Sequence, residues 1–141
     1  MIVALSALLQ AASQPVTAPL PPPQPSAWPA LPSLEFQRPG AMSDLFRFVR
    51  DEVDGGRCAA VSVDAAGTST VRVPVIVLID PKGNALSTIP AAIGCPTVEQ
   101  YTAGVIGRMT TGNVRQPWPA APAWFRTGLT YSWTRSSLRP R

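Results

Sequence analysis

Proline is unevenly distributed along this chain, and its distribution limits where a regular fold can form. Nine of the 17 prolines lie between Pro15 and Pro39. Proline has no backbone N–H to donate, and its ring does not fit inside an α-helix or a central β-strand. We therefore predict a disordered proline-rich linker over residues 14–40, with an extended polyproline II stretch from Pro19 to Pro32. We interpret the linker as a spacer, and the alternative is a ligand for an aromatic-lined groove.

The N-terminal residues have the apolar character of a secretory signal. An apolar run from Ile2 to Leu9 ends in the small residues Ala11-Ala12-Ser13. This run is shorter than the roughly 20 apolar residues that a membrane-spanning helix needs, and it fits a signal peptide over residues 1–13. No basic residue follows Met1, so a longer signal or a membrane anchor is the alternative if the true N-terminus lies upstream. We expect a periplasmic or secreted protein.

Two cysteines, Cys58 and Cys95, are the only ones in the chain. Exported proteins keep disulfides, whereas the cytosol keeps thiols reduced. A bridge would close a loop of 37 residues, to which the chain-entropy model assigns roughly 3–4 kcal/mol. The alternative is a reactive thiolate at Cys95, which precedes a predicted helix. Because the chain has no histidine to activate a thiol, we predict the disulfide.

Helical and strand patterns appear only after about Arg38, which predicts a folded domain over residues 41–134. The first element is a helix over residues 43–53, with Ser43 as a suitable N-cap and the glycines after Asp54 as a stop signal. Leucine, phenylalanine and valine recur at helical spacing along it. Its charged residues are expected to form a solvated face: Arg47, Arg50, Asp51 and Glu52.

Three strands, a helix and a last strand are expected to follow. A short apolar run covers residues 58–63, the strongest β-branched run covers 71–79, and residues 85–89 return after a tight turn. A helix begins at Pro96 and stops before a Gly-Asn pair, and residues 124–133 alternate as an amphipathic strand. We predict an α+β domain, in which a small antiparallel sheet carries two helices packed on one face.

The composition excludes several kinds of chemistry within this chain. It contains no histidine, which rules out Ser-His-Asp and Cys-His catalysis and imidazole ligands for a metal. Two cysteines do not suffice for a structural zinc site. Asp51, Glu52 and Asp54 cluster at a helix end and Asp80 belongs to a turn, so no opposed pair of carboxylates is expected in a cleft. We predict a protein that is not an enzyme and that needs no metal and no cofactor.

Three features occur in an order that is found in a known family. The strand Val75–Ile79 runs into the turn Asp80-Pro81-Lys82-Gly83-Asn84, residues 98–109 form an amphipathic helix, and residues 125–133 form an alternating last strand. With a hydrophobic N-terminus and a proline-rich linker ahead of it, the stretch from residue 71 to residue 133 resembles the C-terminal domain of the TonB energy-transducer family. The resemblance implies a TonB-C-like fold and a role in binding proteins of the cell envelope.

The function that this resemblance implies is binding by strand addition. An extended segment of a cell-envelope protein or peptide would pair with an exposed edge of the sheet, and main-chain hydrogen bonds would supply the affinity. We expect the last strand to provide that edge; the alternative is that it is paired on both sides inside the domain. The predicted partner-binding residues share one face of this strand: Phe125, Thr127, Leu129, Tyr131 and Trp133.

The basic residues suggest a second hypothesis. The chain has 12 Lys and Arg against 8 Asp and Glu, and residues 135–141 form a basic tail directly after Trp133. A structural, envelope-associated protein could use this Trp/Arg tail to contact lipid or cell-wall polymer. The partners expected from the sequence do not include nucleic acid, because an exported protein rarely meets it.

Overall fold

The computed structural model describes residues 20–40 and 45–134. The predicted signal peptide over residues 1–13, the predicted N-cap Ser43 and the basic tail over residues 135–141 lie outside this part of the chain. None of the helices in the described part is long and apolar enough to cross a membrane.

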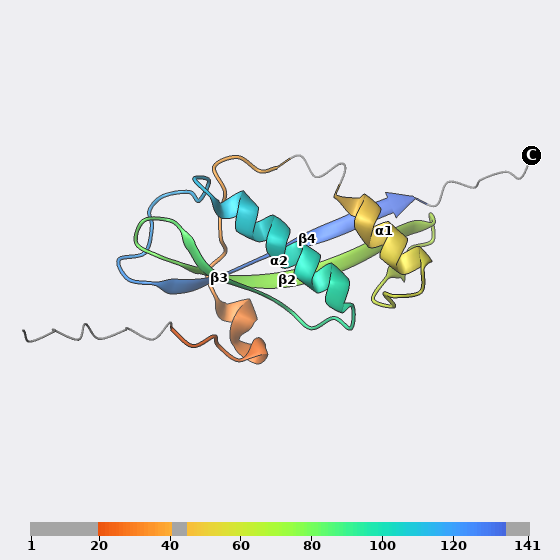
Figure 1. Cartoon of the computed structure of the whole chain (residues 1–141), viewed down its shortest axis with the longest axis horizontal. Coiled ribbons are helices and arrows are strands. Elements are labelled where there is room, and N and C mark those ends of the chain that lie inside the picture. The colour runs from red at the N-terminus through yellow and green to blue at the C-terminus, as the bar shows by residue number, and fades with distance from the viewer. Residues whose placement is uncertain (1–19, 41–44, 135–141) are drawn as a thin grey trace, which may run out of the picture.

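One long strand organises the sheet. β2 (Thr68–Ile79) is rich in β-branched residues, which favour strands, and it pairs along its whole length with the antiparallel strand β4 (Ala123–Thr134). On its other side, β2 pairs with β1 (Ser62–Val63) near its start and with β3 (Ala85–Pro90) near its end, both antiparallel. The two longest strands therefore run side by side through the molecule, and β4 lies at the border of the sheet (Figure 1).

Two helices cover one face of this sheet. α1 (Phe46–Asp54) and α2 (Pro96–Thr110) lie side by side across β2 and β4 (Figure 1). Val49 of α1 and Val98 and Ile106 of α2 are fully buried in the core between helices and sheet. Every second residue of β2 faces them and is also buried: Val71, Val73, Val75, Val77 and Ile79. The predicted α+β class, with two helices packed on one face of a small antiparallel sheet, is confirmed.

From residue 20 onward the proline-rich segment forms part of the fold, contrary to the prediction of a disordered linker over residues 14–40, of which residues 14–19 lie outside the described part of the chain. Residues 20–31 run over the other face of the sheet, where Pro25–Ala30 form a 3-10 helix, η1. Trp28 and Leu31 pack there against a small apolar cluster formed by Ile76, Leu78 and Trp124. The physical reason is that β2 is apolar on both faces at this end, because a run from Val75 to Ile79 has no polar alternate residues. This second apolar face needs a cover, and the proline-rich segment supplies it. Beyond η1 the chain passes the edge of β4 at Ser33, and Leu34 and Phe36 pack into the core on the helix side.

The predicted disulfide is present. Cys58 and Cys95 are joined with an S–S distance of 2.05 Å, and both side chains are buried. The bond ties the loop after α1 to the residue that precedes α2. The strand expected over residues 58–63 is shorter than predicted, because only Ser62–Val63 pair with β2.

One member of the predicted solvated face of α1 is buried. Glu52 is 7% exposed; it accepts a hydrogen bond from the Thr97 hydroxyl at 2.6 Å and pairs with Arg57 at 3.0 Å. The Thr97 hydrogen bond, assisted by Arg57, lowers the pKa of Glu52 below its usual value. Glu52 therefore links α1 to the start of α2, next to the disulfide.

Candidate functional site: the outer edge of the last strand

Within residues 20–40 and 45–134, the last strand has a strand neighbour on one side only. β4 pairs with β2 from Ala123 to Thr134 without a shift in register. On its outer side, among the described residues, the only β-bridge joins Ser33 to Arg126 in parallel orientation. The alternative of a strand paired on both sides is therefore not what the described residues show: from Gly128 onward the outer edge of β4 has no strand neighbour.

The backbone groups that point outward can be identified from the contacts of Arg126. Its N–H donates to the Pro32 carbonyl at 2.9 Å, and its carbonyl accepts from the Leu34 N–H at 2.8 Å. Because successive residues of a strand direct these groups to opposite sides, the same outward direction applies to Gly128, Thr130 and Ser132. We call these three residues, with Thr134, the free edge.

Nothing in the sequence of the free edge protects it from pairing. Natural edge strands are usually guarded by charged side chains, proline, a bulge or a very short length. Residues 128–134 contain no charged residue and no proline, and the register opposite β2 is regular throughout. A long, regular and uncharged edge of this kind is a template for another strand.

The side chains predicted to bind a partner lie mostly in the core. Leu129, Tyr131 and Trp133 are 4%, 3% and 7% exposed and pack beneath the helices. Phe125 and Thr127 are half-buried. The burial of Trp133 also removes it from the Trp/Arg tail of the second hypothesis, because its side chain is not available to lipid or polymer.

The groups that remain accessible on β4 belong to the alternate residues, which were not singled out from the sequence. The side chains of Arg126, Thr130, Ser132 and Thr134 are all exposed, and their backbone groups point outward. The signal that could have found them is the alternation itself, since the polar face of an amphipathic strand is the face left to solvent.

The buried face holds the edge in place. The hydroxyl groups of Tyr131 and Thr102 lie 2.8 Å apart and share a hydrogen bond. Burial raises the pKa of Tyr131 to about 12, so this phenol is neutral at ordinary pH. Tyr131 therefore fixes β4 to α2 while the opposite side of the strand stays open.

Gly128 allows the close approach of β2 and β4 in the middle of the pair. It lies opposite Pro74, and a Cβ atom at this position would lie 2.7 Å from the Val73 carbonyl oxygen and 3.2 Å from the Pro74 Cα. Any side chain would push the strands apart. Gly128 also leaves the exposed face of the sheet without a side chain next to Arg126.

A groove adjoins the free edge on the face that carries η1. It has a volume of about 550 Å³ and lies between η1 and the sheet, with Trp28, Pro74 and Arg126 among its lining residues. Its walls are mainly apolar, and the groove reaches the border of the sheet at Thr127, where residues 32–34 end their contact with β4. A chain that is bound along the free edge would thus meet the mouth of this groove.

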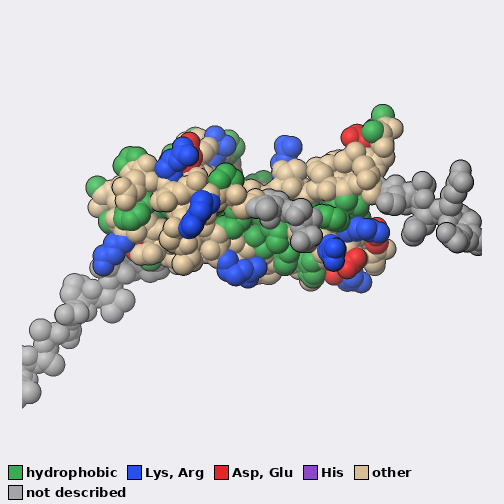
Figure 2. Space-filling model, turned by 90° about the horizontal axis from the view of Figure 1, so that it is seen from above, with side chains coloured by type: hydrophobic (Ala, Val, Ile, Leu, Met, Phe, Trp, Pro, Cys, Tyr) green, Lys and Arg blue, Asp and Glu red, His purple; other side chains and the backbone are tan. Residues whose placement is uncertain are grey.

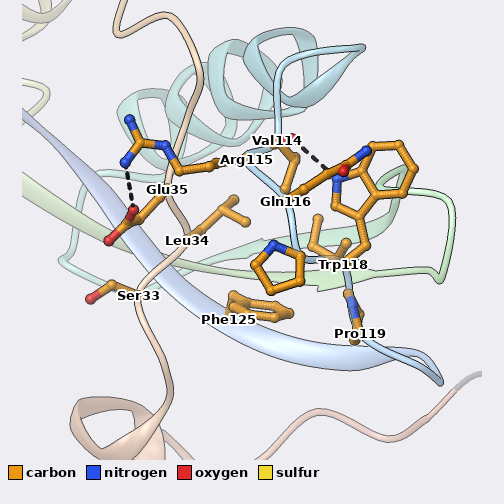
Figure 3. Close-up of a pocket in the computed structure, with 11 residues that line it drawn as sticks. Ser33, Leu34, Glu35, Val114, Arg115, Gln116, Trp118, Pro119 and Phe125 are labelled. Atoms are coloured by element: carbon orange, nitrogen blue, oxygen red, sulfur yellow. Dashed lines mark hydrogen bonds and ion pairs between the residues drawn. The ribbon is translucent and has the colours of Figure 1, made fainter.

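A second, smaller pocket of about 170 Å³ lies at the loop end of the molecule. Figure 3 shows the ion pair between Glu35 and Arg115, at 3.2 Å, on one side and Trp118 on the other. The Trp118 indole donates to the Val114 carbonyl at 3.1 Å. These polar groups are bonded to one another, and among the described residues no group of three His, Cys, Asp or Glu side chains is placed to hold a metal ion.

Comparisons with known proteins found no similar protein: no family model, no curated protein and no solved structure matches the chain. The geometry of the site therefore carries the functional argument.

Proposed function

We propose that this chain is an exported, non-enzymatic binding module that takes up an extended partner segment by strand addition at the free edge of β4. The observation that carries the proposal is the uncharged edge from Gly128 to Thr134, which has no strand neighbour among the described residues and is packed from behind against the core. Main-chain hydrogen bonds to such an edge supply affinity without requiring a particular partner sequence.

One segment of the chain itself already pairs with the outer edge of β4. Residues 32–34 lie along β4 as an extended segment and exchange two backbone hydrogen bonds with Arg126. The Arg126 side chain adds a third bond, to the Leu31 carbonyl at 2.9 Å. An extended segment is thus accommodated on the outer side of β4, and the free edge continues the same line of donors and acceptors.

A TonB-C-like fold and an envelope location are part of this proposal. The order β2, turn, β3, α2, β4 is the order that the sequence resemblance implies, which supports it. The buried disulfide supports residence in an oxidising compartment, because such bonds rarely persist in the cytosol.

The test uses the full chain with its disulfide intact and a library of displayed random nonapeptides as the probe. The variant is Thr130→Pro, which removes an outward N–H and leaves the hydrogen bonds from β4 to β2 in place. Its matched control is Thr130→Val, which keeps the N–H. We expect selected peptides to bind the wild type and the Thr130→Val variant equally, and to lose at least about tenfold in affinity for Thr130→Pro, as for the loss of 1–2 hydrogen bonds.

Amide hydrogen exchange gives a second readout of the same complex. Bound peptide should slow exchange at the outward amides of Thr130 and Ser132 and leave Leu129 and Tyr131, which already bond to β2, unchanged. Peptides that bind Thr130→Pro as well as the wild type, or a library that yields no binder, would rule out strand addition at β4.

A further inference from the structure

Charge is divided unequally between the two parts of the chain. Residues 100–141 contain six arginines and no acidic residue, whereas residues 1–99 contain six basic and eight acidic residues. The last strand, which carries the proposed binding edge, lies wholly within the basic part. Figure 2 shows basic side chains spread over the face in view, with fewer acidic ones, which lie towards its ends.

Arginines surround the free edge. Arg126 is exposed at its start and borders the apolar groove. Arg50 lies beside its far end, where it shares a surface hollow with Ser132 and Thr134. Arg72 is exposed on the open face of β2, directly opposite Thr130. A strand added to the free edge would therefore lie next to Arg126 and Arg50 at its two ends. On one face it would lie two strand spacings, about 9.5 Å, from the backbone of Arg72, a separation that a long arginine side chain and a facing carboxylate can bridge.

Most of the described carboxylates are already bonded inside the chain, and only Asp54 pairs with one of these three arginines. Arg72 and Arg126 form no ion pair among the described residues, and Arg50 is paired only with Asp54, at 3.4 Å on the surface. Exposed pairs of this kind are weak. Six acidic residues accept a bond from another group of the chain: Glu35, Glu52, Asp54, Asp64, Asp80 and Glu99.

From this charge pattern we infer that the segment captured at the free edge is acidic: an extended polypeptide stretch that carries Asp or Glu on the side chains facing Arg72 and Arg50. The inference rests on the proposed strand addition. The backbone of β4 supplies affinity for any strand, and the arginines select among strands by charge and accelerate their capture.

The experiment compares three versions of the best peptide selected at low salt: the peptide itself, a version with Asp and Glu changed to Asn and Gln, and a version with these positions changed to Lys. At about 50 mM salt we expect the neutral version to bind at least about tenfold more weakly, and the Lys version more weakly still. At about 500 mM salt the difference should shrink to about twofold, because salt screens exposed charges.

Two variants locate the effect. Arg72→Gln should weaken the acidic peptide by about three- to tenfold and the neutral peptide by less than about twofold. Lys82→Gln is the matched control, since Lys82 lies in the turn beyond the opposite end of β2 and is also exposed. It should leave both affinities unchanged.

The outcomes separate the inference from the proposed function. If acidic and neutral peptides bind equally and Thr130→Pro still abolishes binding, strand addition holds and the acidic partner is wrong. If Thr130→Pro has no effect on any peptide, the proposed function fails and the inference fails with it. If vesicles of anionic lipid displace the acidic peptide and bind the Thr130→Pro variant unchanged, the arginines serve a membrane surface and the inference is overturned.

Discussion

At the residue scale, Glu52 makes an unusual contribution for a carboxylate on a short surface helix. It is buried, and it accepts a hydrogen bond from Thr97, which lies 45 positions further along the chain. This contact joins the two helices at the point where the disulfide also joins them. Its charge is stabilised in the folded state, as its lowered pKa indicates.

The lowered pKa predicts an acid-sensitive contribution to stability. A carboxylate whose folded pKa lies below its unfolded value of 4.5 contributes stability that is present above that value and is lost as the pH falls through the folded pKa. We expect the thermal midpoint of the wild type to fall between about pH 5 and pH 2 more steeply than that of Glu52→Gln. Calorimetry of the two proteins over this range checks it. Parallel curves would mean that Glu52 plays no part, and Asp80, whose pKa is lowered mainly by the Asn84 N–H, would then account for the acid response.

Gly128 gives a second prediction, because it has no room for a side chain. The Val73 carbonyl would lie 2.7 Å from an added Cβ, so Gly128→Ala must separate the strands or distort one of them. We expect a loss of about 1–3 kcal/mol, as for other overpacked sites, measured by urea denaturation. The control is Gly104→Ala, on the exposed side of α2, where the nearest atom is an Arg108 side-chain nitrogen at 3.6 Å. That change should stabilise by about 0.5–1 kcal/mol, and a Gly128→Ala protein of unchanged stability would contradict the close approach.

At the element scale, periodicity and stop signals located most of the helices and strands. β2, β3, α2 and β4 appear within a few residues of the predicted bounds, because each has a regular pattern between proline or glycine signals. The exposed face of β4 was also predictable, since the polar residues of an alternating strand are left to solvent. Whether β4 pairs on one side or on both was not predictable, because the order of strands in the sheet is set by long-range contacts.

The proline-rich segment was the main failure of sequence reasoning. Its composition is typical of an extended spacer, and no apolar period marks it as structured. What fixes it is tertiary: Trp28 and Leu31 meet Ile76, Leu78 and Trp124, and the Trp124 indole donates to the Pro21 carbonyl at 3.1 Å. Trp28 and Trp124 are separated by 96 positions, so no local sequence pattern predicts their contact.

The packing of η1 predicts that Trp28 stabilises the whole domain. Trp28→Ala should expose part of the Ile76 and Leu78 side chains and cost about 1–3 kcal/mol, less than a fully buried tryptophan because Trp28 is half-buried. Ser26→Ala, at an exposed position of the same helix, should change stability by less than about 0.5 kcal/mol. Both are measured by urea denaturation of the full chain. If the two variants unfold at the same urea concentration, η1 does not contribute to the fold.

At the scale of the whole molecule, the disulfide ties the loop after α1 to the start of α2. It joins residues separated by 37 positions, and with β1 only two residues long the segment between α1 and β2 has little other support. Reduction, or the paired change of Cys58 and Cys95 to serine, should lower the free energy of unfolding by about 3–4 kcal/mol. Denaturation with and without reductant measures it, with the double serine variant as the control that must not respond to reductant. Equal stability in all four conditions would contradict this prediction.

The segment at residues 32–34 also limits the length of any strand that binds beside it. It ends the accessible edge at Arg126, so an added strand can begin only at Gly128, and it has the described part of β4 beside it as far as Thr134. At about 3.3 Å per residue, this seven-residue footprint is about 23 Å long. Any longer partner has to turn away from the sheet at the Arg126 end, and that exit leads towards the mouth of the apolar groove beneath η1.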